Sequence, residues 1–230
     1  MKEFVIDDIH GAHLALEQCM ERAKFDRKED ALICLGDVCD GWPFVKNCFD
    51  DLLKIKNLTY ILGNHDRWAL QWSLYGWKED IWLSQGGLKT ILSYQGGPMP
   101  DDHMALLKNA KIFLKKDNRI FVHGGFDPLT PIESQSPDDV LWDRNLLQQA
   151  SIENFDNPSF RFGPYEDIFV GHTPTLRFNS IKPLHLCNLW ALDTGAGWNG
   201  SLTIMNIHTK EYWQSDLVTD LYPNIHGRTK

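Results

Sequence analysis

The chain contains little cysteine, and its cysteines are not spaced for disulfides or for zinc. Its 230 residues include 5 cysteines, an odd number, and no CxxC pair. Cys34 and Cys39 lie within an apolar run and the loop that follows it, a setting that suits reduced thiols. A cysteine-ligated metal is therefore disfavoured, and we expect a cytoplasmic protein.

Long hydrophobic segments are also absent. The chain begins Met-Lys-Glu-Phe-Val-Ile-Asp-Asp, which lacks the apolar core of a signal peptide. No stretch approaches the roughly 18 unbroken apolar residues that a membrane-spanning helix needs. We therefore expect an unexported protein with no membrane partner.

Positive charge is too scarce for a dedicated nucleic-acid binder. The sequence carries 23 Lys and Arg against 31 Asp and Glu, a formal net charge of −8. Such a molecule repels phosphate-rich polymers unless metal ions or a local basic patch reverse the field. Nucleic acid is therefore a disfavoured partner that stays open, and nothing in the sequence indicates an oligomeric state.

The sequence alternates apolar strands with segments of helical spacing, as α/β proteins do. Length and composition suit one domain, which we place at 1–230. Strands are expected at 4–6, 31–35, 58–62, 120–122 and 167–170, and further strands at 189–192 and 201–207 could form a second sheet. The segment 72–116 looks like a mostly helical insertion. We predict two packed mixed β-sheets flanked by helices, with parallel strands whose carboxyl ends share one edge.

Residues able to bind metals follow each of five predicted strands. Loops at the carboxyl ends of strands form the crevice where α/β proteins bind ligands. Imidazole nitrogens mixed with carboxylate and amide oxygens suit manganese, iron or zinc. Residues two apart in an extended segment face the same side, so Asp8 and His10 could bind one ion. The residues at the strand ends are Asp8, His10, Asp37, Asn64, His65, His123 and His172.

A carboxylate such as Asp37 can bridge two ions. Paired ions about 3.5–4 Å apart clamp the attacking and leaving oxygens of an in-line displacement. The strand-end residues therefore favour a two-metal hydrolase.

Five segments in order resemble the blocks of the calcineurin-like metallophosphoesterases, whose fold has four layers. The chain looks most similar to the phosphoprotein-phosphatase branch, in particular the small bacterial and bacteriophage serine/threonine phosphatases, and is also similar to symmetrical diadenosine tetraphosphate hydrolases. The segments are Asp8-Ile9-His10-Gly11, Gly36-Asp37-Val38-Cys39-Asp40-Gly41, Gly63-Asn64-His65-Asp66, Val122-His123-Gly124-Gly125 and Gly171-His172-Thr173-Pro174.

The resemblance implies a role for each matching residue. Asp8 and His10 would hold the first metal, Asp37 would bridge, and Asn64, His123 and His172 would hold the second. A hydroxide bridging two divalent ions, most simply Mn, with Fe or Zn possible, would be the nucleophile. The resemblance further implies that His65 is the general acid and that Asp66 fixes its ring.

The sequence departs from the resemblance in its second block. An arginine that grips a substrate phosphate usually follows the second Asp, whereas Asp40 is followed by Gly41 and Trp42. The resemblance makes Arg144 the best phosphate ligand, with Asn64 beside it, because guanidinium can bind two oxygens at once. Arg67 and Arg177 are further candidates to supply the lost charge.

Three residues near these blocks have open roles. Asp40 could cap a helix beginning near Pro43 or brace a loop, which we favour, or could accept a hydrogen bond from a ligand. Trp42 beside the site could stack on a nucleotide base. Asp7 precedes the first-block aspartate, and in an extended chain it should point away from the metal of Asp8.

The sequence predicts an enzyme that hydrolyses phosphomonoesters, most simply a serine/threonine protein phosphatase acting on a phosphorylated protein or a small phosphoester. The alternative is a nucleotide or dinucleoside polyphosphate hydrolase, or a nucleic-acid-related phosphoesterase. A non-catalytic scaffold is disfavoured because His65 and every implied metal ligand are present.

Overall fold

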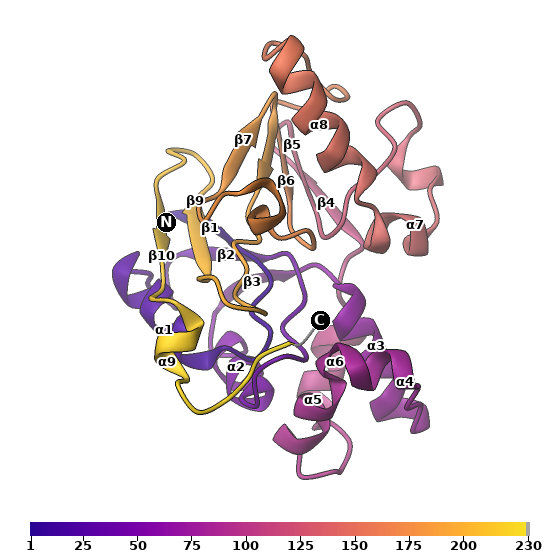
Figure 1. Ribbon diagram of the computed structural model, residues 1–230, viewed down its shortest axis with the longest axis vertical. Coiled ribbons are helices and arrows are strands. Elements are labelled where there is room, and N and C mark those ends of the chain that lie inside the picture. The colour runs from indigo at the N-terminus through magenta and orange to yellow at the C-terminus, as the bar shows by residue number, and fades with distance from the viewer. Residues whose placement is uncertain (229–230) are drawn as a thin grey trace.

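The computed structural model describes residues 1–228 and shows two five-stranded sheets with helices around them (Figure 1). The first sheet has the strand order β10 (Tyr212–Gln214), β9 (Thr203–Asn206), β1 (Glu3–Ile6), β2 (Ala31–Cys34) and β3 (Asn57–Tyr60). The second has the order β4 (Phe113–Lys116), β5 (Arg119–Val122), β6 (Asp167–Val170), β8 (Leu189–Ala191) and β7 (Leu184–Leu186). The predicted class, two mixed sheets flanked by helices, is confirmed.

The second sheet has a parallel centre and antiparallel edges, whereas the first has its parallel strands on one side, with β3 at the edge, and its antiparallel strands on the other. β1, β2 and β3 pair in parallel, as do β5, β6 and β8. The late strands do not form a sheet of their own as expected: β8 and β7 extend the second sheet, whereas β9 and β10 pair antiparallel beside β1. A two-stranded hairpin gains more by burying its apolar face on an existing sheet than by standing alone. The parallel strands end at shared edges, where the strand-end residues gather.

The two sheets meet through one apolar layer. Period-two alternation gives each strand an inward and an outward face, and the inward side chains form this layer. At its centre the rings of Phe121 and Phe169 stack with centroids 4.8 Å apart and planes 3° from parallel. The layer contains Val5, Ile33, Leu35, Ile61, Phe121, Phe169, Leu192, Met205 and Ile207.

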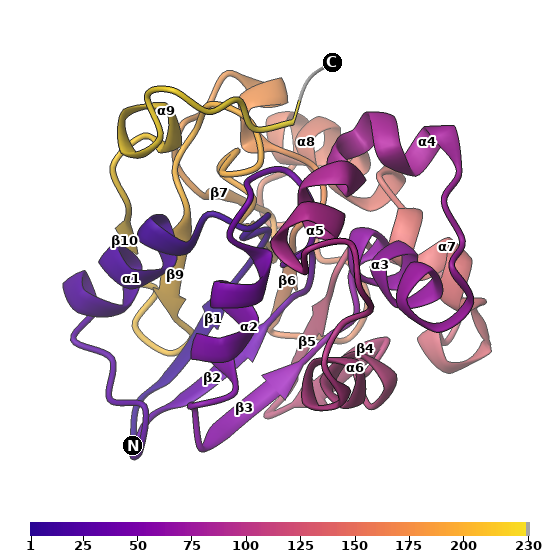
Figure 2. The ribbon, with the colours of Figure 1, turned by 90° about the horizontal axis from the view of Figure 1, so that it is seen from below.

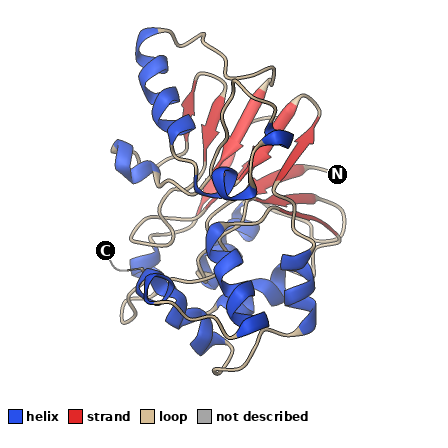
Figure 3. Ribbon diagram, turned by 90° about the vertical axis from the view of Figure 1, so that its right-hand side faces the viewer, coloured by secondary structure: helices blue, strands red, loops and turns tan. Residues whose placement is uncertain are grey.

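The outer faces of the sheets are covered by helices (Figures 2 and 3). α1 (His13–Arg22) and α2 (Val45–Leu52) place their buried residues in the core of the first sheet. α8 (Asn145–Asp156) does the same for the second sheet. No helix among residues 1–228 is long and apolar enough to cross a membrane. The remaining helices are α3 (Asn64–Tyr75), η2 (Ile132–Ser134), α7 (Pro137–Trp142), η3 (Thr175–Phe178) and α9 (Val218–Leu221).

The segment expected as a helical insertion, 72–116, is mostly helical. It includes α4 (Asp80–Trp82), the turn η1 (Leu83–Gly87), α5 (Leu88–Ser93) and α6 (Asp101–Lys108), and its last residues form β4. Of these helices α6 packs against α3 and α5 against α2, and α4 and α5 lie on the same side of the molecule as α3 (Figure 2). η1 is kinked at Gly86, whose φ is 107°, and contributes one residue, Gln85, to the cavity described below.

Truncating the stacked pair should destabilise the protein strongly. Phe121 is fully buried between the sheets, so Phe121→Ala leaves a cavity in a closely packed layer. We expect the free energy of unfolding to fall by about 3–5 kcal/mol, measured by urea unfolding. Phe155→Ala is the matched control because that ring is 89% exposed. Equal losses in the two variants would contradict this account of the sheet interface.

Candidate active site

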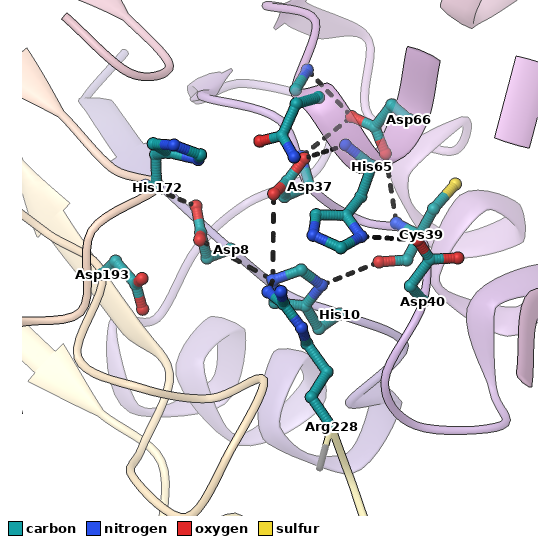
Figure 4. Close-up of polar contacts among 12 residues, drawn as sticks. Asp8, His10, Asp37, Cys39, Asp40, His65, Asp66, His172, Asp193 and Arg228 are labelled. Atoms are coloured by element: carbon teal, nitrogen blue, oxygen red, sulfur yellow. Dashed lines mark hydrogen bonds and ion pairs between the residues drawn. The ribbon is translucent and has the colours of Figure 1, made fainter. Parts of the chain in front are cut away.

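The loops that follow β1, β2, β3, β5 and β6 bring the six expected metal ligands together. Figure 4 shows most of them pointing toward one another around Asp37. All six side chains are buried: Asp8, His10, Asp37, Asn64, His123 and His172. Buried charged and imidazole groups are rare in proteins unless they are paired or bind a metal, so this cluster is a candidate site.

The backbone of these loops is strained at the same positions. Asp8, His10, Asp37 and His172 have φ values of 41°, 48°, 48° and 64°, and Asp40 has 70°. A non-glycine residue with positive φ is uncommon and costs free energy, and such residues concentrate at functional sites. The turns direct the side chains inward at the ends of the strands.

One group of donor atoms surrounds His10. Its Nε2 lies 3.7 Å from Oδ2 of Asp8 and 3.8 Å from Oδ2 of Asp37. Its Nδ1 donates to the carbonyl oxygen of Cys39 at 2.8 Å, so Nε2 is the ring nitrogen that can bind a cation, and Nη1 of Arg228 lies 3.2 Å from it. The three ligand atoms lie within 4.8 Å of one another, a spacing that one metal ion can bridge.

A second group shares Asp37. Ligand atoms of Asp37, His123 and His172 also lie within 4.8 Å of one another. His123 Nδ1 donates to the carbonyl of Leu35 at 3.0 Å, while its Nε2 lies 2.9 Å from Oδ1 of Asn64 and 3.4 Å from Oδ2 of Asp37. Because Asp37 belongs to both groups, it occupies the position expected of a bridging carboxylate.

The electrostatics of the cluster also fit cations. Burial alone would raise the pKa of Asp37, but the charges of His123 and His65 outweigh it and hold that pKa well below its usual range. Burial would lower the pKa of His123, yet Asp37 raises it to about 9. For His172, burial and repulsion from His123 and Arg144 lower the pKa well below its usual value, and its Nε2 is buried with no hydrogen-bond partner among the described residues. Ionised carboxylates and an unpartnered neutral imidazole suit two divalent ions.

Two more buried carboxylates stand beside Asp8. A carboxylate oxygen of Asp7 lies within 4.8 Å of the ligand atoms of Asp8 and His123. The chain was expected to be extended here, which would have pointed Asp7 away, but it turns at Asp8, whose φ is 41°. Asp193, which that argument did not single out, lies beside Asp8 in Figure 4. Burial and the charge of Asp8 raise the pKa of both, well above the usual value. Each therefore favours the neutral acid next to an ionised carboxylate.

His65 is oriented by Asp40, and not by Asp66 as expected. The ring Nδ1 of His65 lies 2.5 Å from Oδ2 of Asp40. Asp40 in turn accepts hydrogen bonds from Trp82 Nε1 at 2.9 Å and from Thr90 Oγ1 at 2.6 Å. Asp40 does not cap α2, which begins only at Val45, but its bonds to Trp82 and Thr90 give it the loop-bracing role favoured beside the cap. The helical segment 72–116 thus holds the carboxylate that orients His65.

Asp66 instead organises the backbone beneath the site. Its carboxylate accepts hydrogen bonds from the backbone N–H groups of Asp37, Val38 and Cys39 at 2.8, 3.0 and 3.1 Å. Gly63 N–H and the Tyr60 hydroxyl also donate to it, at 3.2 and 2.9 Å. Burial and the charge of Asp37 raise the pKa of Asp66 to about 6, so it is ionised at neutral pH. It connects the loop after β2 with the start of α3.

A cavity of about 400 Å³ lies beside the donor groups. Three of the candidate phosphate ligands, Arg144, Asn64 and Arg177, line it. Arg67 is not a lining residue, because its guanidinium forms an ion pair with Asp138, with Nη1 2.5 Å from Oδ1. The lining residues are Asn64, His65, Trp68, Ile81, Gln85, Trp142, Arg144, His172, Pro174, Arg177, Trp198 and Arg228.

Sequence reasoning missed Arg228 and misplaced Trp42. Arg228 Nη1 lies 3.2 Å from Nε2 of His10, although 218 positions separate them along the chain. No strand-end pattern or motif surrounds Arg228, so nothing in the sequence marked it. Trp42 is 1% exposed and donates from Nε1 to the carbonyl of Ala196 at 2.7 Å, so it cannot stack on a substrate.

The fold and the buried donor groups define a metal-dependent hydrolase, and the comparisons agree. The family model described as calcineurin-like phosphoesterase matches residues 4–188. The chain belongs to this calcineurin-like phosphoesterase family.

Named relatives fall into two kinds. The chain is 26% identical over 214 residues to serine/threonine-protein phosphatase 1 of Salmonella typhimurium, covering 89% of this chain and 91% of the relative. It is 22% identical over 273 residues to a symmetrical bis(5'-nucleosyl)-tetraphosphatase of Neisseria meningitidis, covering 93% and 95%. Both relatives are matched over nearly their full length.

Solved structures share the fold. A candidate diadenosine tetraphosphatase superposes with a TM-score of 0.69 at 20% identity, covering 93% of this chain and 92% of that one. A serine/threonine phosphatase of Saccharomyces cerevisiae superposes with a TM-score of 0.63 at 14% identity, covering 100% and 84%. The four-layer arrangement is therefore that of the family.

Metal binding should stabilise the folded chain. Manganese at 100 times its dissociation constant should raise the free energy of unfolding by about 2.7 kcal/mol, seen as a higher melting temperature. Isothermal titration calorimetry should count two ions per chain, and Asp37→Asn should reduce both the count and the stabilisation. Asp51→Asn, in a separate cluster with His13 and Glu17, is the matched control. Identical stabilisation of the parent and Asp37→Asn would contradict the site.

Proposed function

We propose that this chain hydrolyses phosphomonoesters by a two-metal mechanism and that it is a serine/threonine protein phosphatase. The supporting observation is that Asp37 is shared by two groups of buried donor atoms beside a cavity lined by Arg144 and His65. A site of this kind places a phosphate between cations and a proton donor. Asp8, His10 and Asp37 would hold one ion, and Asp37, Asn64, His123 and His172 the other, with manganese as the expected metal.

The two ions, when bound, would lower the pKa of water and draw charge from the phosphoryl oxygens. Side chains of the protein bind the phosphate, donate the proton and position the loop. Arg144 binds phosphate oxygens from the cavity, and its Nε is buried with no hydrogen-bond partner among residues 1–228. His65 protonates the leaving oxygen from Nε2 while Nδ1 stays on Asp40. Asp66 holds the loop that carries Asp37 in place and does not touch the substrate.

The protein phosphatase assignment draws on the relatives. The Salmonella typhimurium relative named serine/threonine-protein phosphatase 1 has higher identity than the Neisseria meningitidis tetraphosphatase, 26% against 22%. The cytoplasmic location predicted from the scattered cysteines remains a proposal, consistent with five free thiols.

A second candidate, a dinucleoside polyphosphate or nucleotide hydrolase, is favoured by the walls of the cavity. Trp68, Trp142 and Trp198 line it, and none of them is fully buried. Aromatic faces hold nucleobases by about 1–3 kcal/mol each. Proteins that share this active-site chemistry differ in substrate because the surrounding pocket differs.

Loss of the bridging carboxylate or of the general acid should remove activity. With manganese and an aryl phosphate, we expect Asp37→Asn and His65→Asn to lower kcat by about 10²–10⁴-fold, measured by phosphate release. The matched controls are Asp101→Asn and His208→Asn at exposed positions. Full turnover in either site variant would overturn the mechanism.

A substrate panel separates the two candidates. Turnover of a phosphoserine peptide, diadenosine tetraphosphate and a 2′,3′-cyclic nucleotide is compared on the manganese-loaded protein. Preference for the peptide would support the protein phosphatase, and preference for either nucleotide would replace it with the second candidate.

Asp40 should set the pH range in which His65 can donate a proton. Burial lowers the pKa of His65, and the charge of Asp37 together with the hydrogen bond and charge of Asp40 opposes that shift. Asp40→Asn removes the part that Asp40 contributes, so the pKa of His65 falls further. A general acid works only while protonated, so kcat declines as pH rises through this pKa, and in Asp40→Asn the decline should begin at lower pH. An unmoved profile of kcat against pH would contradict the role of Asp40.

A further inference from the structure

The side chain of Arg228 lies beside Gly41, where the resemblance places an arginine. Gly41 has φ of +82°, and a Cβ added there would lie 3.4 Å from Cγ of Arg228. A Cβ added at Gly86, in η1, would also lie 3.4 Å from that Cγ. These are ordinary van der Waals distances, so the aliphatic stem of Arg228 packs directly over glycines from two separate loops.

The segment from Tyr222 to Arg228 is fixed against Trp42, the other departure in the second block. The Tyr222 ring stacks on Trp42 with centroids 4.8 Å apart. A Cβ at Gly227 would lie only 2.7 Å from Cζ2 of Trp42, so the backbone passes close over the indole. The backbone N–H of Arg228 donates to the carbonyl of Gly197 at 2.9 Å. Trp42 is thus a platform for this segment, which we call the 222–228 strap.

The guanidinium of Arg228 is held at the cavity by neutral groups. Its Nη2 donates to Oε1 of Gln85 at 2.6 Å, and the group lies 4.5 Å from the centroid of the Trp198 ring. Neither Arg228 nor Arg144 forms an ion pair with a carboxylate of residues 1–228. Nε of each is buried without a hydrogen-bond partner in that range.

Two partly buried guanidinium groups without counter-ions favour an anion between them. Both line the cavity that also contains His65. The contact between Nη1 of Arg228 and Nε2 of His10 places the guanidinium beside a candidate metal ligand. A phosphate held there would satisfy donors that are now unpaired, and guanidinium matches phosphate oxygens in a bidentate way.

We propose that Arg228, delivered by the 222–228 strap, binds a phosphate oxygen of the substrate together with Arg144 and substitutes for the arginine absent at Gly41. The inference rests on the proposed phosphoesterase function and adds a residue to it. Both departures in the second block then contact this segment: the stem of Arg228 packs against Gly41, and Tyr222 and Gly227 pack against Trp42. Gln85 gives the segment 72–116 a part in orienting the guanidinium.

The test compares phosphate binding in matched arginine variants of the manganese-loaded protein. Calorimetric titration with inorganic phosphate should show about 10- to 100-fold weaker binding in Arg228→Met, and KM for an aryl phosphate should rise by a similar factor. Arg228→Lys should recover part of both, because it restores the charge without the bidentate geometry. Saturating manganese keeps metal occupancy equal in all variants, because Nη1 of Arg228 contacts the candidate ligand His10. Arg22→Met is the control, since Arg22 pairs with Asp216 at the surface.

A second variant tests the hydrogen bond between Arg228 and Gln85. Gln85→Leu keeps the volume of the side chain but removes the acceptor of Arg228 Nη2, so it should weaken phosphate binding less than Arg228→Met does. Phosphate affinity in Arg228→Met within twofold of the parent, together with lost turnover in Asp37→Asn, would overturn the role of Arg228 and leave the proposed function standing. Failure of the parent itself to bind phosphate or to hydrolyse any ester would overturn both.

Discussion

The active-site loops depend on one buried carboxylate, that of Asp66. It accepts hydrogen bonds from three successive backbone N–H groups after β2, from Gly63 and from the Tyr60 hydroxyl. A single acceptor therefore fixes the loop that carries Asp37 to the start of the helix that carries Asn64 and His65. An ionised oxygen satisfies donors more strongly than a neutral one, which suits a position that must hold strained backbone in place.

The buried aspartates around the site have different roles, although their side chains are chemically identical. Asp37 and Asp8 face the metal position, Asp40 faces the imidazole of His65, and Asp66 faces only the backbone and a hydroxyl. Their surroundings set their ionisation, as the opposite pKa shifts of Asp37 and Asp193 show. A negatively charged protein can thus assemble a site for an anion, since its local field is set by histidines, arginines and bound cations.

The sequence predicted the parts of the fold and site that follow from local pattern. The parallel strands could be predicted because each is a short apolar run ending in a glycine or polar turn, and the six candidate ligands because each follows such a strand. The partner of His65 could not, since Asp66 is its neighbour in sequence whereas Asp40 lies 25 positions away in the loop after β2, and only the folded geometry selects between them. Arg228 could not either, because a contact across 218 positions leaves no periodic or motif signal.

The positive φ angles at Asp8, His10, Asp37 and His172 limit which side chains fit these positions, in addition to the limit that metal binding sets. Aspartate, asparagine and histidine are the side chains enriched in left-handed backbone, and the same side chains bind divalent cations. A β-branched or bulky replacement would be rejected by the turn even before it failed as a ligand. The shape of these loops and the chemistry of metal binding therefore favour the same few side chains at these positions.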